Sequence, residues 1–197
     1  VLEAFRLIGS EQIQGRASLG GNICNGSPAG DSVPALIAAG CMALIAGPKG
    51  KREIPIEEFH IGPGKTVLNN GEMLVSLKFP KREIHSSDTY LRMTPRTEMD
   101  IAVVGCGVNI TFENNVCTAA RVSLGAVAPT PLLIKEASKI MIGSDLNSEI
   151  LDKVSKICMD SCDPIDDKRG TIDYRTKVAG VLFKRATLTT IDRIKGN

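Results

Sequence analysis

A glycine-rich stretch near the N-terminus holds the residues best suited to bind a ligand. Residues 16–32 read Arg-Ala-Ser-Leu-Gly-Gly-Asn-Ile-Cys-Asn-Gly-Ser-Pro-Ala-Gly-Asp-Ser. Consecutive glycines permit positive φ, and they let several backbone N–H groups converge on an anion without interference from Cβ atoms. A phosphate group suits such a loop. The Gly20-Gly21-Asn22 run also suits a simple tight turn, and spacing alone does not decide between the two.

A helix is predicted directly after this stretch, over residues 31–39. Asp31 or Ser32 is its expected N-cap, Pro34 lies in its first turn, and Gly40 ends it. The N-terminal dipole of this helix would add to the attraction for an anion. Asp31 itself could accept hydrogen bonds from ligand hydroxyls.

The remaining candidates for chemistry give weaker signals. Residues 62–66, Gly-Pro-Gly-Lys-Thr, resemble the end of a nucleotide-binding P-loop, but Phe59 stands where that motif needs its first glycine, so we expect a surface turn. His60 is expected in a short helix as a surface or packing residue without a functional role. Arg92 and Arg96 could reach an anionic ligand or a cofactor ring, although such arginines more often form ion pairs. We expect no catalytic side chain here.

The composition indicates a folded protein with few specialised features. Of the 197 residues 43% are hydrophobic, and the formal net charge of +2 is spread evenly, with seven basic and seven acidic residues in residues 1–80. This balance offers no basic stripe for nucleic acid. We expect the six cysteines to be reduced thiols and no metal site to be present. No apolar run is long enough to span a membrane, so a cytoplasmic location is the default expectation.

Hydrophobic periodicity divides the chain near residue 80 and indicates an α+β fold. Before that point we predict the end of a helix at 1–9, the helix at 31–39, a hairpin of strands 42–46 and 51–56, and a strand at 73–79. After it we predict strands near 89–94, 101–112 and 116–124, then helices that include 150–158 and 174–186. In the strand at 101–112, apolar residues alternate with glycine and polar residues, which predicts a sheet with one buried face.

Several of these segments, in this order, resemble the FAD-binding medium subunits of the molybdenum hydroxylases, a family that includes xanthine dehydrogenase and the molybdenum carbon monoxide dehydrogenase. The resemblance covers essentially the whole chain and is most specific in its first and last motifs. It is carried by residues 8–35, 59–66, 72–75, 99–102 and 162–175.

The resemblance implies a fold and a set of cofactor-binding residues. Residues 1–80 would be the second, incomplete subdomain of a PCMH-type FAD-binding domain, and residues 81–197 the small C-terminal domain of antiparallel sheet and helices. Arg92 stands where the family often has lysine. The residues implied to lie at the FAD are Ile8, Ser18, Leu19, Gly20, Gly21, Asn22, Asn25, Asp31, Leu74 and Arg92.

The family also has an earlier subdomain with a second glycine-rich loop of the Ala-Gly-Gly-Thr kind, which no residue of this sequence supplies. We therefore expect the sequence to be a fragment of a longer subunit; the alternative is that another polypeptide supplies the missing half. On its own, this chain is expected to bind FAD weakly or not at all, because one loop leaves much of the cofactor in water.

The resemblance implies an electron-transfer subunit of a molybdenum hydroxylase, in which FAD passes electrons from iron–sulfur clusters to a final acceptor. The implied partners are a large molybdopterin-binding subunit and a small 2Fe-2S subunit in a hetero-oligomer, with molybdopterin and 2Fe-2S clusters only in those partners. One alternative is a cofactor-free assembly module of the same complex. Another is an independent flavin oxidase of a related fold.

Overall fold

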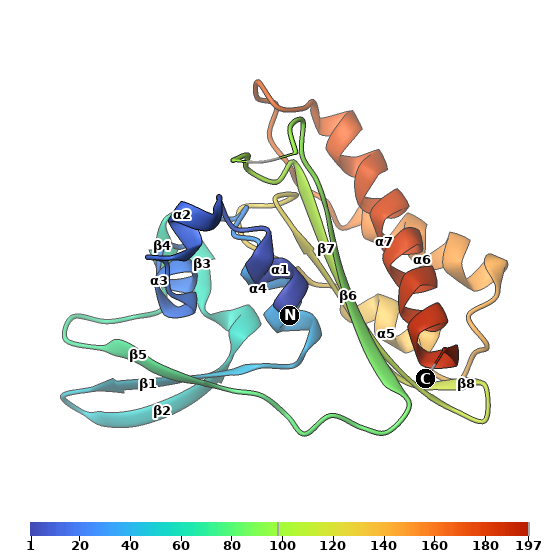
Figure 1. The fold of residues 1–197 in the computed structure, drawn as a ribbon, viewed down its shortest axis with the longest axis horizontal. Coiled ribbons are helices and arrows are strands. Elements are labelled where there is room, and N and C mark those ends of the chain that lie inside the picture. The colour runs from blue at the N-terminus through green and yellow to red at the C-terminus, as the bar shows by residue number, and fades with distance from the viewer. Residues whose placement is uncertain (98, 197) are drawn as a thin grey trace.

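The computed structural model describes residues 1–97 and 99–196 and confirms the α+β class, with three antiparallel sheets (Figure 1). The sheets have the strand orders β2-β1-β5, β3-β4 and β6-β7-β8-β9. The helices are α1 (Leu2–Arg6), α2 (Glu11–Gln14), α3 (Leu19–Cys24), α4 (Ser32–Ala38), the 3₁₀ helix η1 (Ile56–Glu58), α5 (Lys135–Met141), α6 (Ser148–Asp160) and α7 (Ile172–Lys195). The strands are β1 (Met42–Gly47), β2 (Gly50–Pro55), β3 (His60–Gly62), β4 (Lys65–Thr66), β5 (Met73–Lys78), β6 (Ser86–Met93), β7 (Val104–Glu113), β8 (Val116–Gly125) and β9 (Leu132–Leu133).

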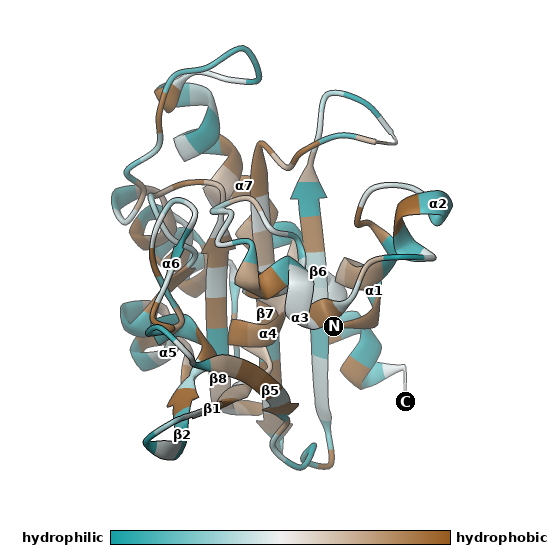
Figure 2. Ribbon diagram, turned by 90° about the vertical axis from the view of Figure 1, so that its left-hand side faces the viewer, coloured by the Kyte–Doolittle hydropathy of each residue, from teal (hydrophilic) through white to brown (hydrophobic). Residues whose placement is uncertain are grey.

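The three-stranded sheet confirms the predicted hairpin and the strand that follows it. β1 pairs with β2 through a turn at Gly47–Gly50 and with β5 on its other side. Ala43 and Ile45 point to one face and are fully buried beside Val33, Leu36 and Ile37 of α4. This alternation gives the sheet its core-facing side. In Figure 2 β5 is largely apolar, and its Met73 is 63% exposed.

The four-stranded sheet is covered on both faces, so the prediction of a single buried face is wrong for its central strand. Val104 to Val108 are all buried. Figure 1 shows α4 on one side of β7 and α7 on the other. Gly107 explains the close approach of α4, since a Cβ at this position would lie 2.6 Å from the Pro34 carbonyl oxygen. Gly107, which appeared to mark an open face, therefore makes room for a helix.

The apolar side of this sheet packs against the C-terminal helices. Cys106, Val108 and Ile110 lie in one buried cluster with Val154 and Cys158 of α6, and with Ala179 and Phe183 of α7. α7 has a side-chain N-cap, because the Thr171 hydroxyl accepts a hydrogen bond from the Tyr174 N–H at 3.2 Å. Within residues 1–97 and 99–196, no helix combines the length and apolar character that crossing a bilayer requires.

Candidate functional site at the N-terminus of α3

The glycine-rich stretch forms a short helix, not the predicted loop with positive φ at its glycines. Gly20 and Gly21 lie inside α3, and neither has positive φ. Ser18 is the N-cap, and its hydroxyl accepts a hydrogen bond from the Gly21 N–H at 3.0 Å. The expectation is wrong because a serine cap and a fully buried Ile23 stabilise one helical turn despite the low helix propensity of glycine.

The start of α3 still presents bare backbone to the surface. The N–H groups of Leu19 and Gly20 have no partner inside the helix, because the first amides of any helix lie beyond the reach of its carbonyls. A Cβ on Gly20 would meet no atom beyond its own turn of helix within 4 Å, so no other part of the protein covers this residue. An anion can therefore approach the first turn of α3 closely, where the helix dipole also favours negative charge.

A cavity of about 280 Å³ lies beside this turn and brings three of the predicted residues together. Its wall includes Ile8, Ser18 and Leu19, together with Phe5 of α1 and Gln14 of α2. The Gln14 side-chain amide donates hydrogen bonds to the carbonyls of Arg6 (2.9 Å) and Ile8 (3.0 Å), which fixes the segment after α1. Ligand sites are usually about 300–1,000 Å³, so this cavity suits one part of a large cofactor.

The two asparagines of the stretch have different surroundings. Asn22 joins α3 to α4, because its Oδ1 accepts a hydrogen bond from the Ser32 hydroxyl at 2.5 Å. Asn25 is exposed and is the C-cap of α3, so it lies at the opposite end of the helix from Ser18. At a rise of 1.5 Å per residue, Ser18 and Asn25 lie about 10 Å apart along the helix axis. Asn22 thus positions α3, whereas the structure places Asn25 away from the amides of Leu19 and Gly20.

The structure brings Asp31 and Arg92 together in a buried ion pair. Arg92 Nη1 lies 2.7 Å from Asp31 Oδ2, and the two side chains are only 6% and 9% exposed. Burial raises the pKa of Asp31, while the nearby Arg92 charge and the hydrogen bonds oppose that change. The Tyr90 hydroxyl donates to Asp31 Oδ1 at 2.8 Å, and burial raises the pKa of that phenol well above its usual value.

Tyr90 is a contact that sequence reasoning missed. Its phenol lies under Gly105, where a Cβ would come within 2.7 Å of the hydroxyl oxygen. The pairing of Arg92 with Gly105 in the β6–β7 register produces this arrangement. The sequence offered one signal, a glycine within a predicted strand, which often marks a close approach of another group. Only the strand register shows that the group accommodated by Gly105 is the Tyr90 phenol.

Leu74, the last predicted residue, belongs to the apolar core under α3. It pairs with Ile45 across the β1–β5 ladder and packs against the buried cluster that includes Ile23. It is partly exposed, and it does not line the cavity of about 280 Å³ beside α3.

The part of the chain that the structure describes contains no group of three or more His, Cys, Asp or Glu residues that could hold a metal ion. All six cysteines are free, as predicted. Burial raises the pKa of Cys158 to about 12 and that of Cys41 to about 11, so these thiols stay protonated at neutral pH.

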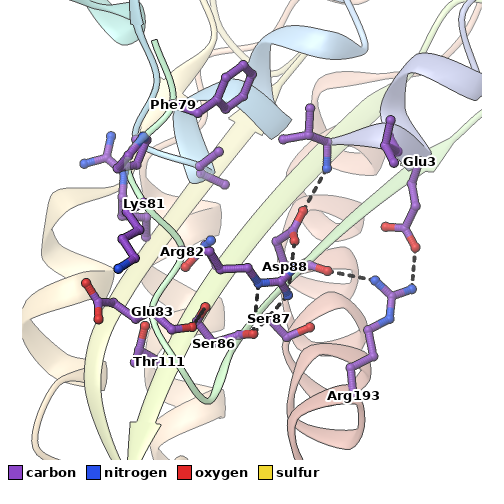
Figure 3. A pocket seen from close by; sticks show the side chains of 18 of the residues that line it. Glu3, Phe79, Lys81, Arg82, Glu83, Ser86, Ser87, Asp88, Thr111 and Arg193 are labelled. Atoms are coloured by element: carbon purple, nitrogen blue, oxygen red, sulfur yellow. Dashed lines mark hydrogen bonds and ion pairs between the residues drawn. The ribbon is translucent and has the colours of Figure 1, made fainter. Parts of the chain in front are cut away.

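A larger cavity of about 920 Å³ lies elsewhere, between α1, the segment before β6 and the end of α7 (Figure 3). Several of its charged side chains pair with one another: Asp88 lies 3.8 Å from Arg82, and Arg193 pairs with Glu3. Its wall contains none of the ten residues predicted to bind a cofactor.

Comparisons with known proteins define the class. The family model of the CO dehydrogenase flavoprotein C-terminal domain matches residues 89–190, and that of the FAD binding domain in molybdopterin dehydrogenase matches residues 1–82. The chain therefore belongs to the family of FAD-binding medium subunits of the molybdenum hydroxylases, which confirms the resemblance seen in the sequence.

Individual relatives agree with this assignment. The carbon monoxide dehydrogenase medium chain of Afipia carboxidovorans is 33% identical over 94% of this chain and 64% of its own length. The xanthine dehydrogenase FAD-binding subunit of Escherichia coli O157:H7 is 30% identical over 90% of this chain and 61% of its own. A crystal structure of carbon monoxide dehydrogenase from Hydrogenophaga pseudoflava superposes with a TM-score of 0.93 at 30% identity, covering 97% of this chain and 66% of that one. This chain thus spans 61% to 64% of the length of the two curated relatives named here.

Proposed function

We propose that this chain binds FAD with its diphosphate at the N-terminus of α3 and transfers electrons within a molybdenum hydroxylase. The observation that carries the proposal is the open first turn of α3: the amides of Leu19 and Gly20 have no partner inside the helix, and a Cβ on Gly20 would meet no atom beyond its own turn of helix within 4 Å. Family membership supports FAD as the ligand. Residues 1–80 are proposed as part of the FAD-binding domain, with residues 81–197 as the C-terminal domain.

The residues present fit one part of an FAD molecule. The amides of α3 would bind the diphosphate, and Ile8 and Leu74 would offer apolar surface to the flavin ring. The adjoining cavity of about 280 Å³ is lined by Ile8, Ser18 and Leu19. Both carboxylate oxygens of Asp31 are bound inside the protein, to Arg92 and Tyr90, so its proposed role is to hold the start of α4 beside α3. The redox chemistry would be supplied by the flavin when bound, and the side chains named here bind and orient it.

The complex is proposed by analogy with the relatives. The similar proteins include medium chains of carbon monoxide dehydrogenase, and a medium chain has partner chains. The proposed partners are a large molybdopterin-binding subunit, which would oxidise the substrate, and a small 2Fe-2S subunit, which would deliver the electrons. We propose a cytoplasmic hetero-oligomer.

The proposal is tested by purifying the subunit as its gene encodes it, with and without its partners. The expected preparation is yellow, shows flavin absorbance and releases FAD on denaturation. In the assembled complex, substrate should bleach that absorbance, and removal of the iron–sulfur partner should prevent the bleaching. A colourless full-length preparation that also rejects added FAD would favour the cofactor-free assembly module. Turnover without any molybdenum partner would favour an independent flavin oxidase.

A further inference from the structure

The β3–β4 hairpin packs directly against the C-terminal end of α3. The Gly64 N–H donates a hydrogen bond to the Gly26 carbonyl at 2.9 Å. A Cβ on Gly26 would lie 2.9 Å from the Gly64 carbonyl carbon, so the two backbones are in contact. Phe59, directly before the hairpin, is fully buried in the same cluster as Ile23. Residues 62–66, which were expected to form a surface turn, therefore contact α3, the helix capped by Ser18.

His60 makes the second link between the hairpin and α3. Its Nε2 lies 2.7 Å from the backbone oxygen of Ile23, and the residue is only 6% exposed. Because a carbonyl oxygen only accepts hydrogen bonds, Nε2 must carry the proton. In the neutral ring Nδ1 is then the unprotonated nitrogen, and it is buried without a hydrogen-bond partner among the described residues. The expectation that His60 lies in a short helix is wrong, because η1 ends at Glu58 and His60 begins β3.

The site disfavours the protonated ring. A proton on Nδ1 would place an unpaired N–H and a charge in an apolar setting, and burial accordingly lowers the pKa of His60 below 6.5, while the bond to Ile23 opposes this change. The ionisable groups on the neighbouring elements are Cys24, Glu57, Glu58 and Lys65. Glu57 binds Arg121 through Oε1 at 2.9 Å, and the other three residues are exposed. The shift of the His60 pKa has burial and the Ile23 hydrogen bond as its causes, with no contribution from a neighbouring carboxylate.

We propose that His60 is a positioning residue for the cofactor: its ring and the Gly26–Gly64 contact hold the C-terminal end of α3, so that the opposite end presents its amides to the FAD diphosphate. The inference rests on the proposed function. α3 has only six residues, and a helix this short does not hold its own direction without tertiary contacts. His60 supplies one such contact to the Ile23 carbonyl. A proton on Nδ1 would leave the Nε2–H donor in place but would bury a charged N–H without a partner, so protonation favours movement of the ring out of this position and away from α3.

The test compares three variants of the full-length subunit. His60→Gln keeps an N–H donor for the Ile23 carbonyl but does not titrate. His60→Phe removes the donor. His85→Gln is the matched control, because His85 is the only other histidine and lies exposed outside this hairpin. FAD affinity is measured by titration from about pH 7.5 to about pH 5, a range that spans ordinary histidine protonation. Hydrogen exchange of the α3 amides is followed without FAD over the same range.

Wild type and His85→Gln should bind FAD equally at neutral pH, lose affinity together as the pH falls through the lowered pKa of His60, and show faster α3 exchange in parallel. His60→Gln should bind within about threefold of wild type at neutral pH and lose that pH dependence, while His60→Phe should bind about tenfold more weakly. Identical pH profiles for wild type and His60→Gln, in FAD affinity and in α3 exchange, would overturn the inference. If wild type binds no FAD at any pH, the proposed function fails, and the exchange data alone then decide the role of His60.

Discussion

At the scale of single residues, the Asp31–Arg92 pair is the feature with the largest expected energetic effect. Both side chains are less than a tenth exposed, and Tyr90 completes the hydrogen bonding of the carboxylate. Removing one partner of a buried pair leaves the other charge uncompensated, which typically costs about 3–5 kcal/mol. We therefore expect Arg92→Gln to lower the free energy of unfolding at neutral pH by about that amount, measured by urea denaturation.

The pH dependence of this loss has a definite sign. Burial already raises the pKa of Asp31 in the folded protein, and loss of Arg92 removes a charge that opposes that rise. The loss of unfolding free energy in Arg92→Gln should therefore be largest above the folded pKa of Asp31. It should shrink as the pH falls through that pKa, because a protonated carboxyl costs less to bury than a charged one. Lys139→Gln is the control. The side chains of Lys139 and its partner Glu136 are 69% and 63% exposed, so loss of this ion pair should change the free energy of unfolding little. Equal, small losses in the two variants would contradict this account.

At the scale of elements, two alanine variants distinguish the effect of the contact between the β3–β4 hairpin and α3 from the effect of backbone strain. Gly26 and Gly64 have nearly the same positive φ, +66° and +68°. A Cβ on Gly26 meets the hairpin backbone at 2.9 Å, whereas a Cβ on Gly64 meets nothing within 4 Å. Both alanine variants carry the strain of a positive φ, about 1–2 kcal/mol, and Gly26→Ala adds overpacking of about 1–3 kcal/mol.

Thermal unfolding and FAD titration should therefore rank these variants. Gly64→Ala is expected to lower stability slightly and to leave FAD affinity near that of wild type. Gly26→Ala should lower stability further and weaken FAD binding, because α3 must move away from the hairpin. Equal FAD affinity in two folded variants would show that the hairpin does not position α3.

The elements that the sequence predicted are those with a clear period or a clear turn. The hairpin around Gly47–Gly50, the strand at 73–79 and the long C-terminal helices all appear close to their expected positions. The sequence did not predict α3 as a helix, because two consecutive glycines argue against one and the stabilising contacts come from Ser18 and from distant partners of Ile23. Hairpin β3–β4 was missed because its strands are only three and two residues long.

At the scale of the whole molecule, α4 connects the candidate site to the large sheet. The Ser123 hydroxyl donates to the Pro34 carbonyl at 2.5 Å, and Arg121 Nε donates to the Ile37 carbonyl at 2.8 Å. Asn22 and Asp31, which were predicted as ligand contacts, also join α3 and α4 to their neighbours. Their residue types were readable from the sequence, but their partners were not: Asn22 binds Ser32 in the next helix, and the partners of Asp31 lie about 60 residues along the chain, which periodicity does not reveal. The C-terminal half of the chain thus supports α4 and, through it, the proposed binding site.

The most direct test of the central claim is FAD affinity in Gly20→Ala of the full-length subunit, measured beside its thermal stability without FAD. Alanine is the better helix former by about 0.8–1.0 kcal/mol, and its Cβ meets no protein atom within 4 Å, so the variant should fold at least as well as wild type. That methyl group would occupy the space proposed for the diphosphate. We predict a loss of FAD affinity of about tenfold or more, which corresponds to about 1.4 kcal/mol, with no loss of stability. Unchanged FAD affinity in the folded variant would contradict the proposal that the diphosphate lies at the N-terminus of α3.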